Sequence, residues 1–267
     1  MEFVIVSQQS GIITISMNRP SLHNAFNDQM IVELTAAFNI AAKDSECRVV
    51  ILQSEGKNFS AGADLNWMKS MATLTRNQNR DDAMRLAQLM HTVYTLPKMV
   101  IAKVKGASYG GALGLISACD VAFADSRATF CLSEVKIGLA PAVISPYVIE
   151  AMGLRNARRY MLSAEVFDAQ VAQNIGVVHE VCDLSILDET VMKFAGNASQ
   201  NGPEAVQHCK QLVQSIAHET IGSQTNMLTA DVIADLRVSE EGQEGLAAFL
   251  QKRSPAWRSE LPDSEAH

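Results

Sequence analysis

The sequence predicts an α/β fold, and the prediction rests on three features. Short runs rich in Val and Ile alternate with longer segments whose apolar residues recur at helical spacing, through the first two-thirds of the chain. Glycine-rich turns join several of these runs to the segments that follow, and the last third is helical in pattern. With 267 residues, of which 48% are hydrophobic and 19% charged, the chain can form one large core with an appendage.

The N-terminal segments predict a strand pair, a helix and a buried strand. Residues 3–6 and 12–16 are strand-like runs on either side of a Gln-Ser-Gly turn, as in a hairpin. Either Asn27 or Asp28 can cap a helix, because apolar residues follow at helical spacing. These apolar residues are Ile31, Leu34, Phe38 and Ala41. Residues 48–52 (RVVIL) are continuously apolar, as expected of a buried strand.

Two strand–loop–helix units follow. Residues 55–65 form a loop with small residues where it meets a helix, and a helix over 77–95 stops at Pro97. Residues 100–120 (VIAKVKGASYGGALGLISACD) combine a β-branched run, four glycines and a small-residue apolar segment. A helix that follows such a turn leaves its first N–H groups free, so each loop can present backbone donors to a ligand. A further strand is predicted over 120–124.

The rest of the chain is predicted to be mainly helical. Residues 151–181 combine shorter helices with a V-V-H-E-V strand, and helices dominate from about Asp183. We divide the chain into a core over residues 1–200 and a C-terminal helical region over 201–267. Such a helical tail packs on its own domain or on a neighbouring subunit.

The composition argues against several functions. The net charge of −7 is spread along the chain, whereas nucleic-acid binding requires a basic surface. The five cysteines lack metal-ligand spacing, which favours reduced thiols in a cytoplasmic protein over disulfides or a metal site. The N-terminus lacks the features of a signal peptide, and the uncharged, glycine-rich run 106–119 is too short to span a bilayer. We therefore expect a cytoplasmic protein that binds neither nucleic acid nor membrane.

One motif suggests a serine hydrolase. Residues 106–110 match GxSxG between a strand and a helix, which would make Ser108 a nucleophile. Asp168 and His179 could complete a triad, but they lie only eleven residues apart, and no HGGG-type loop precedes them. Because GxSxG alone is a weak signal, the hydrolase is a distant alternative.

A second interpretation uses both glycine-containing loops. Residues 61–64 (AGAD) and Gly110–Gly111 each precede a helix, so each can offer one main-chain N–H group. Two converging N–H groups form an oxyanion hole without a side chain. Glu134 would add a carboxylate for proton transfer, although a glutamate in an apolar context is equally consistent with a structural ion pair.

Taken together, these segments resemble the crotonase (enoyl-CoA hydratase/isomerase) superfamily over nearly the whole chain. The matching segments are Asn18-Arg19-Pro20, Asn24-Ala25, residues 59–64, residues 106–120, Ser133-Glu134 with Gly138 and Pro141, Glu241-Gly242 and Lys252-Arg253. The resemblance implies a ClpP/crotonase-like superhelix of β-β-α units whose C-terminal helical region assembles homotrimers or hexamers. It also implies an acyl-CoA thioester substrate, with no metal and no cofactor other than the coenzyme A of the substrate.

The resemblance assigns roles to individual residues. The N–H groups of Ala63 and Gly111 would form the oxyanion hole, and Glu134 matches the second of two catalytic hydratase glutamates. The residues assigned to the substrate or to coenzyme A are Ala61, Asp64, Gly110, Gly114, Phe249 and Lys252, the last two often from a neighbouring subunit.

Two departures refine the expected activity. Gly114 stands where the first hydratase glutamate falls, and residues 141–146 (PAVISP) replace the usual Pro-Gly-x-Gly-Gly segment. This variant pattern is similar to that of bacterial methylglutaconyl-CoA or isohexenylglutaconyl-CoA hydratases, whose acyl groups carry a distal carboxylate. Lys69 and Lys136 are the nearby cations in the sequence.

Two further alternatives remain beside the hydratase. A Δ3,Δ2-enoyl-CoA isomerase needs only one glutamate, at the position of Glu134, and is the main alternative. A non-catalytic scaffold or RNA-binding relative is a third, and the acidic net charge argues against it.

Overall fold

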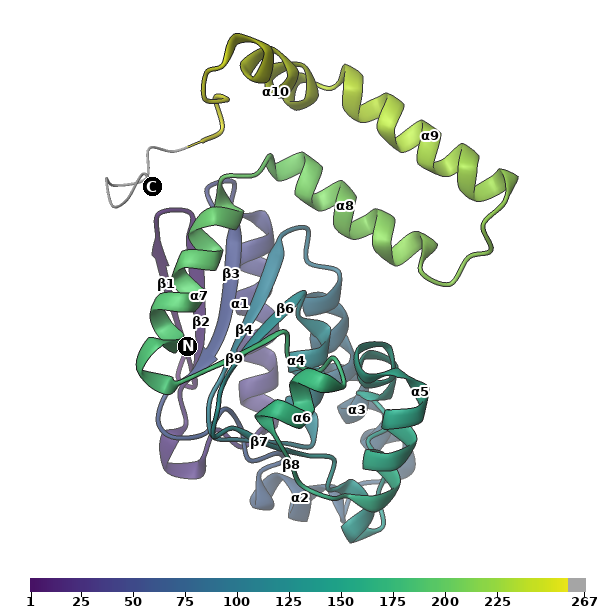
Figure 1. The fold of residues 1–267 in the computed structure, drawn as a ribbon. Coiled ribbons are helices and arrows are strands. Elements are labelled where there is room, and N and C mark those ends of the chain that lie inside the picture. Colours follow the sequence, from purple (N-terminus) through teal and green to yellow (C-terminus); the bar gives the residue numbers. More distant parts are fainter. Residues whose placement is uncertain (259–267) are drawn as a thin grey trace.

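The computed structural model describes residues 1–258 and confirms the α/β class. Its main sheet has six strands in the order β1-β2-β3-β4-β6-β9 (Figure 1). These strands are β1 (Val4–Gln9), β2 (Ile12–Met17), β3 (Val49–Ser54), β4 (Met99–Val104), β6 (Val121–Asp125) and β9 (Glu180–Cys182). The β1–β2 hairpin is antiparallel, and every later neighbour is parallel, as expected when helices connect successive strands.

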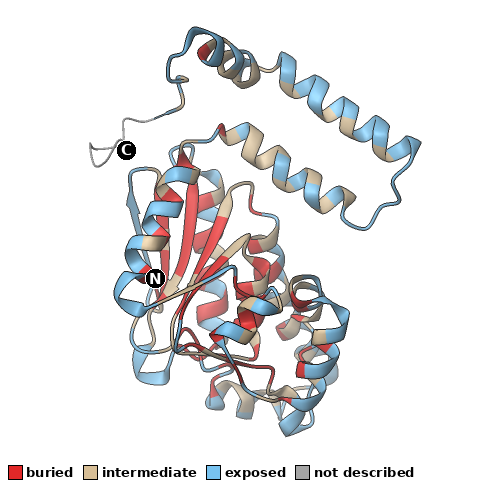
Figure 2. Cartoon of the chain, in the orientation of Figure 1, coloured by how far each residue is buried: buried red, intermediate tan, exposed pale blue. Residues whose placement is uncertain are grey.

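Helices cover both faces of this sheet, so strands β2, β3, β4 and β6 are mostly buried, whereas the edge strand β1 is mostly exposed (Figure 2). One face packs on α1 (Asp28–Lys43), with α3 (Arg76–Tyr94) and α4 (Gly111–Ala118) in the same core cluster. The other face packs on α7 (Leu184–Ser199), where strand residues such as Ile51 meet Leu187. Alternate residues along each strand therefore serve two separate apolar layers.

Most predicted elements occur within two residues of their expected bounds. The cap of α1 is confirmed as Asn27, whose side chain accepts a hydrogen bond from the Met30 N–H at 2.9 Å. The four predicted apolar positions of this helix are all buried. The V-V-H-E-V strand was placed too early, because Val177 and Val178 are buried in the turn before β9 and only Glu180–Cys182 pair with β6.

A second, three-stranded sheet was not predicted from the sequence. It consists of β5 (Ala107–Tyr109), β7 (Thr129–Cys131) and β8 (Phe167–Asp168). It places the glycine-rich turn beside two later segments of the chain, because β5 pairs with β7 in parallel. Strands of two or three residues are too short to show a period in the sequence.

The C-terminal region forms three helices beyond the edge of the core (Figure 1). They are α8 (Pro203–Ile216), α9 (Ser223–Val238) and α10 (Glu240–Gln251). Three contacts tie α8 to the core. Lys210 Nζ lies 2.8 Å from Asp120 Oδ2 and donates to the Lys98 carbonyl at 3.3 Å, and Gln214 donates to the Tyr94 carbonyl at 2.7 Å. The division drawn at residue 200 falls between α7 and α8.

Large apolar side chains remain exposed on α9 and α10. They are Met227, Leu228, Ile233, Val238, Leu246, Phe249 and Leu250. Among residues 1–258, no helix combines the length and the apolar character that a membrane crossing requires.

Candidate active site

The loop before α2 (Leu65–Met71) is held by the side chain of Asp64. Its carboxylate accepts hydrogen bonds from the Asn66 N–H at 2.8 Å and the Trp67 N–H at 3.2 Å, which caps the helix. It also pairs with Arg19 at 2.9 Å. Burial alone would raise the pKa of Asp64, but the hydrogen bonds from Trp67 and Arg19 hold that pKa below its ordinary value. In this chain Asp64 is thus a cap and an ion-pair partner, and its contact with substrate stays a prediction.

The two glycine-containing loops lie side by side. The Ser60 N–H donates to the Ala107 carbonyl at 3.1 Å, and the Tyr109 N–H donates to the Ser60 carbonyl at 3.0 Å. Gly62 has φ of +100°, and a Cβ atom there would lie 3.3 Å from the Tyr109 carbonyl oxygen. The positive φ and the close approach together favour glycine at this position.

Ala63 and Gly111 each present a free backbone N–H group. Hydrogen bonds from Phe26 to Gly62 (2.7 Å) and from Asp64 to Phe26 (2.8 Å) hold the chain on either side of Ala63. Gly111 is the first residue of α4, and a Cβ there would lie 3.6 Å from the Phe26 ring. Both residues therefore border Phe26, and neither N–H donates a hydrogen bond to any group in residues 1–258. Free donors at this point are what an oxyanion hole requires.

Glu134 lies against the second loop. It begins the short helix η2 (Glu134–Ile137), and a Cβ at Gly110 would lie 3.2 Å from its Oε1 atom. Its Oε2 atom is buried and finds no hydrogen-bond partner among the described residues. Burial raises the pKa of Glu134, because desolvation disfavours the charged form. An unpartnered carboxyl with a raised pKa, next to two free N–H groups, suits proton transfer.

The remaining predicted contacts divide into two groups. Ala61 is exposed on the first loop, whereas Gly110 and Gly114 are buried, and Gly114 lies beneath the side chain of Ile144. Phe249 lies on α10 and Lys252 just after it, and Figure 1 shows α10 at the opposite end of the molecule from α2. The structure thus does not bring these last two residues to Glu134 within one chain.

Sequence reasoning missed several residues around Glu134. Phe26 borders both loops, and it was not predicted from the sequence. Ile144, which belongs to the 141–146 segment already noted in the sequence, fills the space next to Gly114. Exposed apolar side chains also come from the first residue of α2, from η2 and from the turn that follows η2. They are Leu65, Val135, Ile137 and Leu139. The alternation of Val135, Ile137 and Leu139 with Lys136 and Gly138 was visible in the sequence, but it does not predict that these apolar side chains are exposed.

The serine hydrolase receives no support from the arrangement of its candidate residues. Ser108 is fully buried in β5, and its hydroxyl lacks a hydrogen-bond partner in the described part of the chain. Asp168 caps α6 (Ala169–Asn174), and His179 Nδ1 accepts a hydrogen bond from the Ala122 N–H. A nucleophile needs a base within hydrogen-bond reach, and Ser108 has none.

Replacing Ser108 with alanine is expected to leave turnover of an enoyl-CoA substrate close to the wild-type rate. The substitution removes a buried hydroxyl without a partner, so the free energy of unfolding should stay the same or rise. Steady-state kinetics and urea unfolding measure the two effects. Labelling of Ser108 by a fluorophosphonate probe, or loss of turnover in Ser108→Ala, would instead support the hydrolase.

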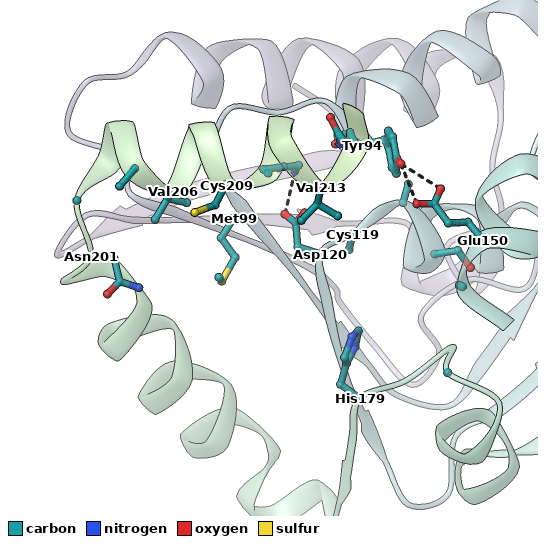
Figure 3. Close-up of a pocket in the computed structure, with 18 residues that line it drawn as sticks. Tyr94, Met99, Cys119, Asp120, Glu150, His179, Asn201, Val206, Cys209 and Val213 are labelled. Atoms are coloured by element: carbon teal, nitrogen blue, oxygen red, sulfur yellow. Dashed lines mark hydrogen bonds and ion pairs between the residues drawn. The ribbon is translucent and has the colours of Figure 1, made fainter. Parts of the chain in front are cut away.

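A large cavity lies elsewhere, beneath α8. Its volume is about 800 Å³, and residues of α3, α4, α5 (Ser145–Ser163) and α8 contribute to its lining. Figure 3 shows Asp120 with its ion pair to Lys210, and Tyr94 with its hydrogen bonds to Glu150. These polar groups are paired with each other, and the residues of both oxyanion loops are absent from the lining of the cavity. Cavity size alone therefore does not locate the chemistry.

The described residues also lack an obvious metal site, since no group of three or more His, Cys, Asp or Glu side chains is gathered within them.

Comparison with known proteins matches residues 7–260 to the family Enoyl-CoA hydratase/isomerase. A 2,3-dehydroadipyl-CoA hydratase of Escherichia coli K12 is 32% identical over 264 residues, covering 97% of this chain and 99% of the relative. A trans-2-decenoyl-[acyl-carrier-protein] isomerase of Streptococcus mutans is 25% identical over 260 residues, covering 94% and 96%.

Solved structures agree with the fold. The crystal structure of an enoyl-CoA hydratase from Shewanella pealeana superposes with a TM-score of 0.93 and 46% sequence identity, covering 96% of each chain. The similarity spans the sheet, both loops and most of the C-terminal helices. The predicted crotonase architecture is thereby confirmed.

Proposed function

This chain belongs to the enoyl-CoA hydratase/isomerase family, and from that premise we propose that it hydrates the α,β double bond of an enoyl-CoA thioester. One observation carries the proposal: two free backbone N–H groups lie beside a buried, unpartnered carboxyl group. An acyl-CoA thioester is the substrate class that the family supports. The geometry suits a reaction in which the thioester oxygen gains negative charge.

In the proposed mechanism, Ala63 and Gly111 stabilise the enolate. Their N–H groups donate to the thioester oxygen, and the donation strengthens as that oxygen becomes negative in the transition state. Gly111 also stands at the N-terminus of α4, where the helix dipole favours negative charge. No side chain has to reorganise during the reaction, because both donors belong to the main chain.

Glu134 supplies the proton transfers. Its ionised carboxylate takes a proton from water as the water oxygen bonds to the β-carbon, and the π electrons move onto the thioester oxygen. The protonated Glu134 then returns that proton to the α-carbon, and the thioester carbonyl reforms. The net change is the addition of one water, so atoms and charge balance with a single carboxyl group. Its raised pKa suits both the base and the acid role.

Double-bond isomerisation is the second candidate, because Gly114 offers no side chain for a second carboxylate. One carboxylate can remove a proton from one carbon and return it to another. The streptococcal relative is named as an isomerase. We favour hydration because the segments around Gly114 and Pro141 resemble those of glutaconyl-CoA hydratases.

For the acyl group, we propose a glutaconyl-type chain with a distal carboxylate. A relative named for the 2,3-dehydroadipyl group, itself derived from a dicarboxylic acid, supports this class of substrate. Lys69 on α2, the helix that follows the first oxyanion loop, and Lys136 in η2, the helix that begins at Glu134, are exposed cations. Either ammonium could pair with the distal carboxylate.

We further propose that coenzyme A is contacted by a neighbouring subunit. Phe249 is 81% exposed on α10, far from Glu134 of its own chain, and Lys252 follows it at the helix end. The exposed apolar side chains on α9 and α10 favour burial against another copy. A homotrimer, or a hexamer built from two trimers, would bring these residues to a second active site.

The reaction is tested by product mass in water enriched in heavy oxygen. We expect a 3-hydroxyacyl-CoA that is one water heavier than the substrate and carries the label. A shifted double bond at unchanged mass, with no hydroxyacyl product, would establish the isomerase instead.

The substrate is tested by a turnover screen of unsaturated acyl-CoAs with and without a distal carboxylate. We expect a higher kcat/KM for the carboxylated set, and equal values for both sets would contradict the glutaconyl assignment. Thermal-shift measurements provide a control that does not depend on turnover. Coenzyme A esters should raise the Tm, whereas RNA should leave it unchanged.

A further inference from the structure

The space that a side chain at Gly114 would need is already filled. Gly114 lies on α4 one turn after Gly111, so both residues share one face of the helix. A Cβ atom at Gly114 would lie 2.2 Å from Ile144 Cγ2 and 2.6 Å from Ile144 Cβ. It would also lie 3.2 Å from the terminal carbon of Met90, a flexible side chain that can give way. The conflict with Ile144 is therefore the decisive one.

Ile144 has little freedom to move aside. It precedes α5 (Ser145–Ser163), and its carbonyl accepts the Val148 N–H at 3.1 Å. Its side chain is 2% exposed and β-branched, so few rotamers are open to it. Rotation could move the Cγ2 atom, but the Cβ atom is attached to the main chain and stays close to Gly114 in every rotamer.

Other glycines of the chain show that this restriction is local. A Cβ at Gly111 would make ordinary contact with Phe26 at 3.6 Å, and one at Gly196 in α7 would meet nothing within 4 Å. Gly114 has an ordinary helical backbone, without the positive φ that marks Gly110. The packing against Ile144 therefore explains why position 114 carries no side chain, whereas the backbone conformation at Gly114 would accept one.

We propose that Ile144 is a specificity-determining residue that excludes a side chain, and hence a second acid, from position 114. The two departures from the usual hydratase sequence are then one coupled change, made at positions thirty residues apart. Exclusion at Gly114 stands on the packing alone. The catalytic consequence is that the site works with Glu134 alone, without a carboxylate on this face of α4. This consequence rests on the proposed function.

The packing is tested by a double-mutant cycle in Tm. Gly114→Ala should lower the Tm, whereas the matched helix control Gly196→Ala should raise it, because alanine is the better helix former. In an Ile144→Gly background, Gly114→Ala should no longer lower the Tm, since both close atoms are gone. Ile144→Ala removes Cγ2 but keeps Cβ and should relieve only part of the effect, and Ile144→Val keeps both γ carbons and should relieve none.

The proposal fails on packing if Gly114→Ala raises the Tm as Gly196→Ala does. It also fails if Gly114→Ala lowers the Tm equally in the wild-type and Ile144→Gly backgrounds. These outcomes need no substrate, so they are separate from the test of the reaction. An enzyme that proves to be an isomerase would leave the packing result intact.

The catalytic consequence is tested with two double variants. Gly114→Glu with Ile144→Gly adds a carboxylate on the face of α4 that carries Gly111, and Gly114→Gln with Ile144→Gly is its uncharged control. Because a positioned acid or base contributes about 100-fold or more, we expect the glutamate variant to hydrate crotonyl-CoA at least about tenfold faster than the glutamine variant. Equal rates in two folded variants would refute the catalytic part of the proposal.

Discussion

Replacing Gly111 with proline is expected to lower turnover about 100-fold or more, because it deletes one of two oxyanion donors. Gly111 is the first residue of α4, a position where proline is well accepted because its N–H has no helical partner. The substitution therefore removes the donor at little cost to the helix. If the loss is confined to the transition state, kcat and kcat/KM should fall together.

Gly111→Ala is the matched control for this experiment. It keeps the N–H group, and its Cβ would meet the Phe26 ring at an ordinary 3.6 Å. We expect Gly111→Ala to retain most of the turnover that Gly111→Pro loses, with similar circular dichroism and Tm for both. A folded Gly111→Pro enzyme with near-normal turnover would contradict the oxyanion assignment.

The sequence allowed both loops to be predicted, because each combines a strand, small residues and the start of a helix. Their contact could not be predicted in the same way. The backbone hydrogen bonds between Ser60 and residues 107–109 join segments almost fifty residues apart, and no local pattern specifies such a pairing. The resemblance to a known family predicted that the two loops form one site, which local sequence propensity does not predict.

The position of Asp64 in the sequence is consistent with two different roles. Its place before Leu65 fits a helix cap as well as a substrate contact, and the structure shows the cap. Similarly, Gly114 and Ile144 were both noticed as departures in the sequence, but their coupling is visible only in three dimensions. Phe249 and Lys252 differ from these residues, because their proposed contact with coenzyme A crosses a subunit boundary, so each lies far from Glu134 of its own chain.

Replacing Glu134 with glutamine is expected to lower turnover about 100-fold to 10,000-fold, the usual contribution of a general acid or base. Glutamine preserves the shape of the side chain beside Gly110 but can neither accept the proton of water nor return it to the α-carbon. Because hydratase and isomerase both need this carboxylate, the variant tests the residue and not the reaction. Wild-type kcat/KM should rise with pH as Glu134 ionises, with a midpoint above the usual glutamate pKa.

The same substitution should stabilise the fold at neutral pH, and this effect separates catalysis from structure. Burial raises the pKa of Glu134 above its ordinary 4.5, so the unfolded chain ionises first as pH rises. The contribution of Glu134 to stability is then greatest below pH 4.5 and declines as pH increases through the raised pKa. Glutamine has no charge to desolvate, so Glu134→Gln should exceed wild type in free energy of unfolding at pH 7 and lose that advantage near pH 4.

Urea unfolding at both pH values measures this difference in the free energy of unfolding. An inactive Glu134→Gln chain that is less stable than wild type at pH 7 would show that the carboxylate stabilises this site, contrary to the burial seen around Oε2.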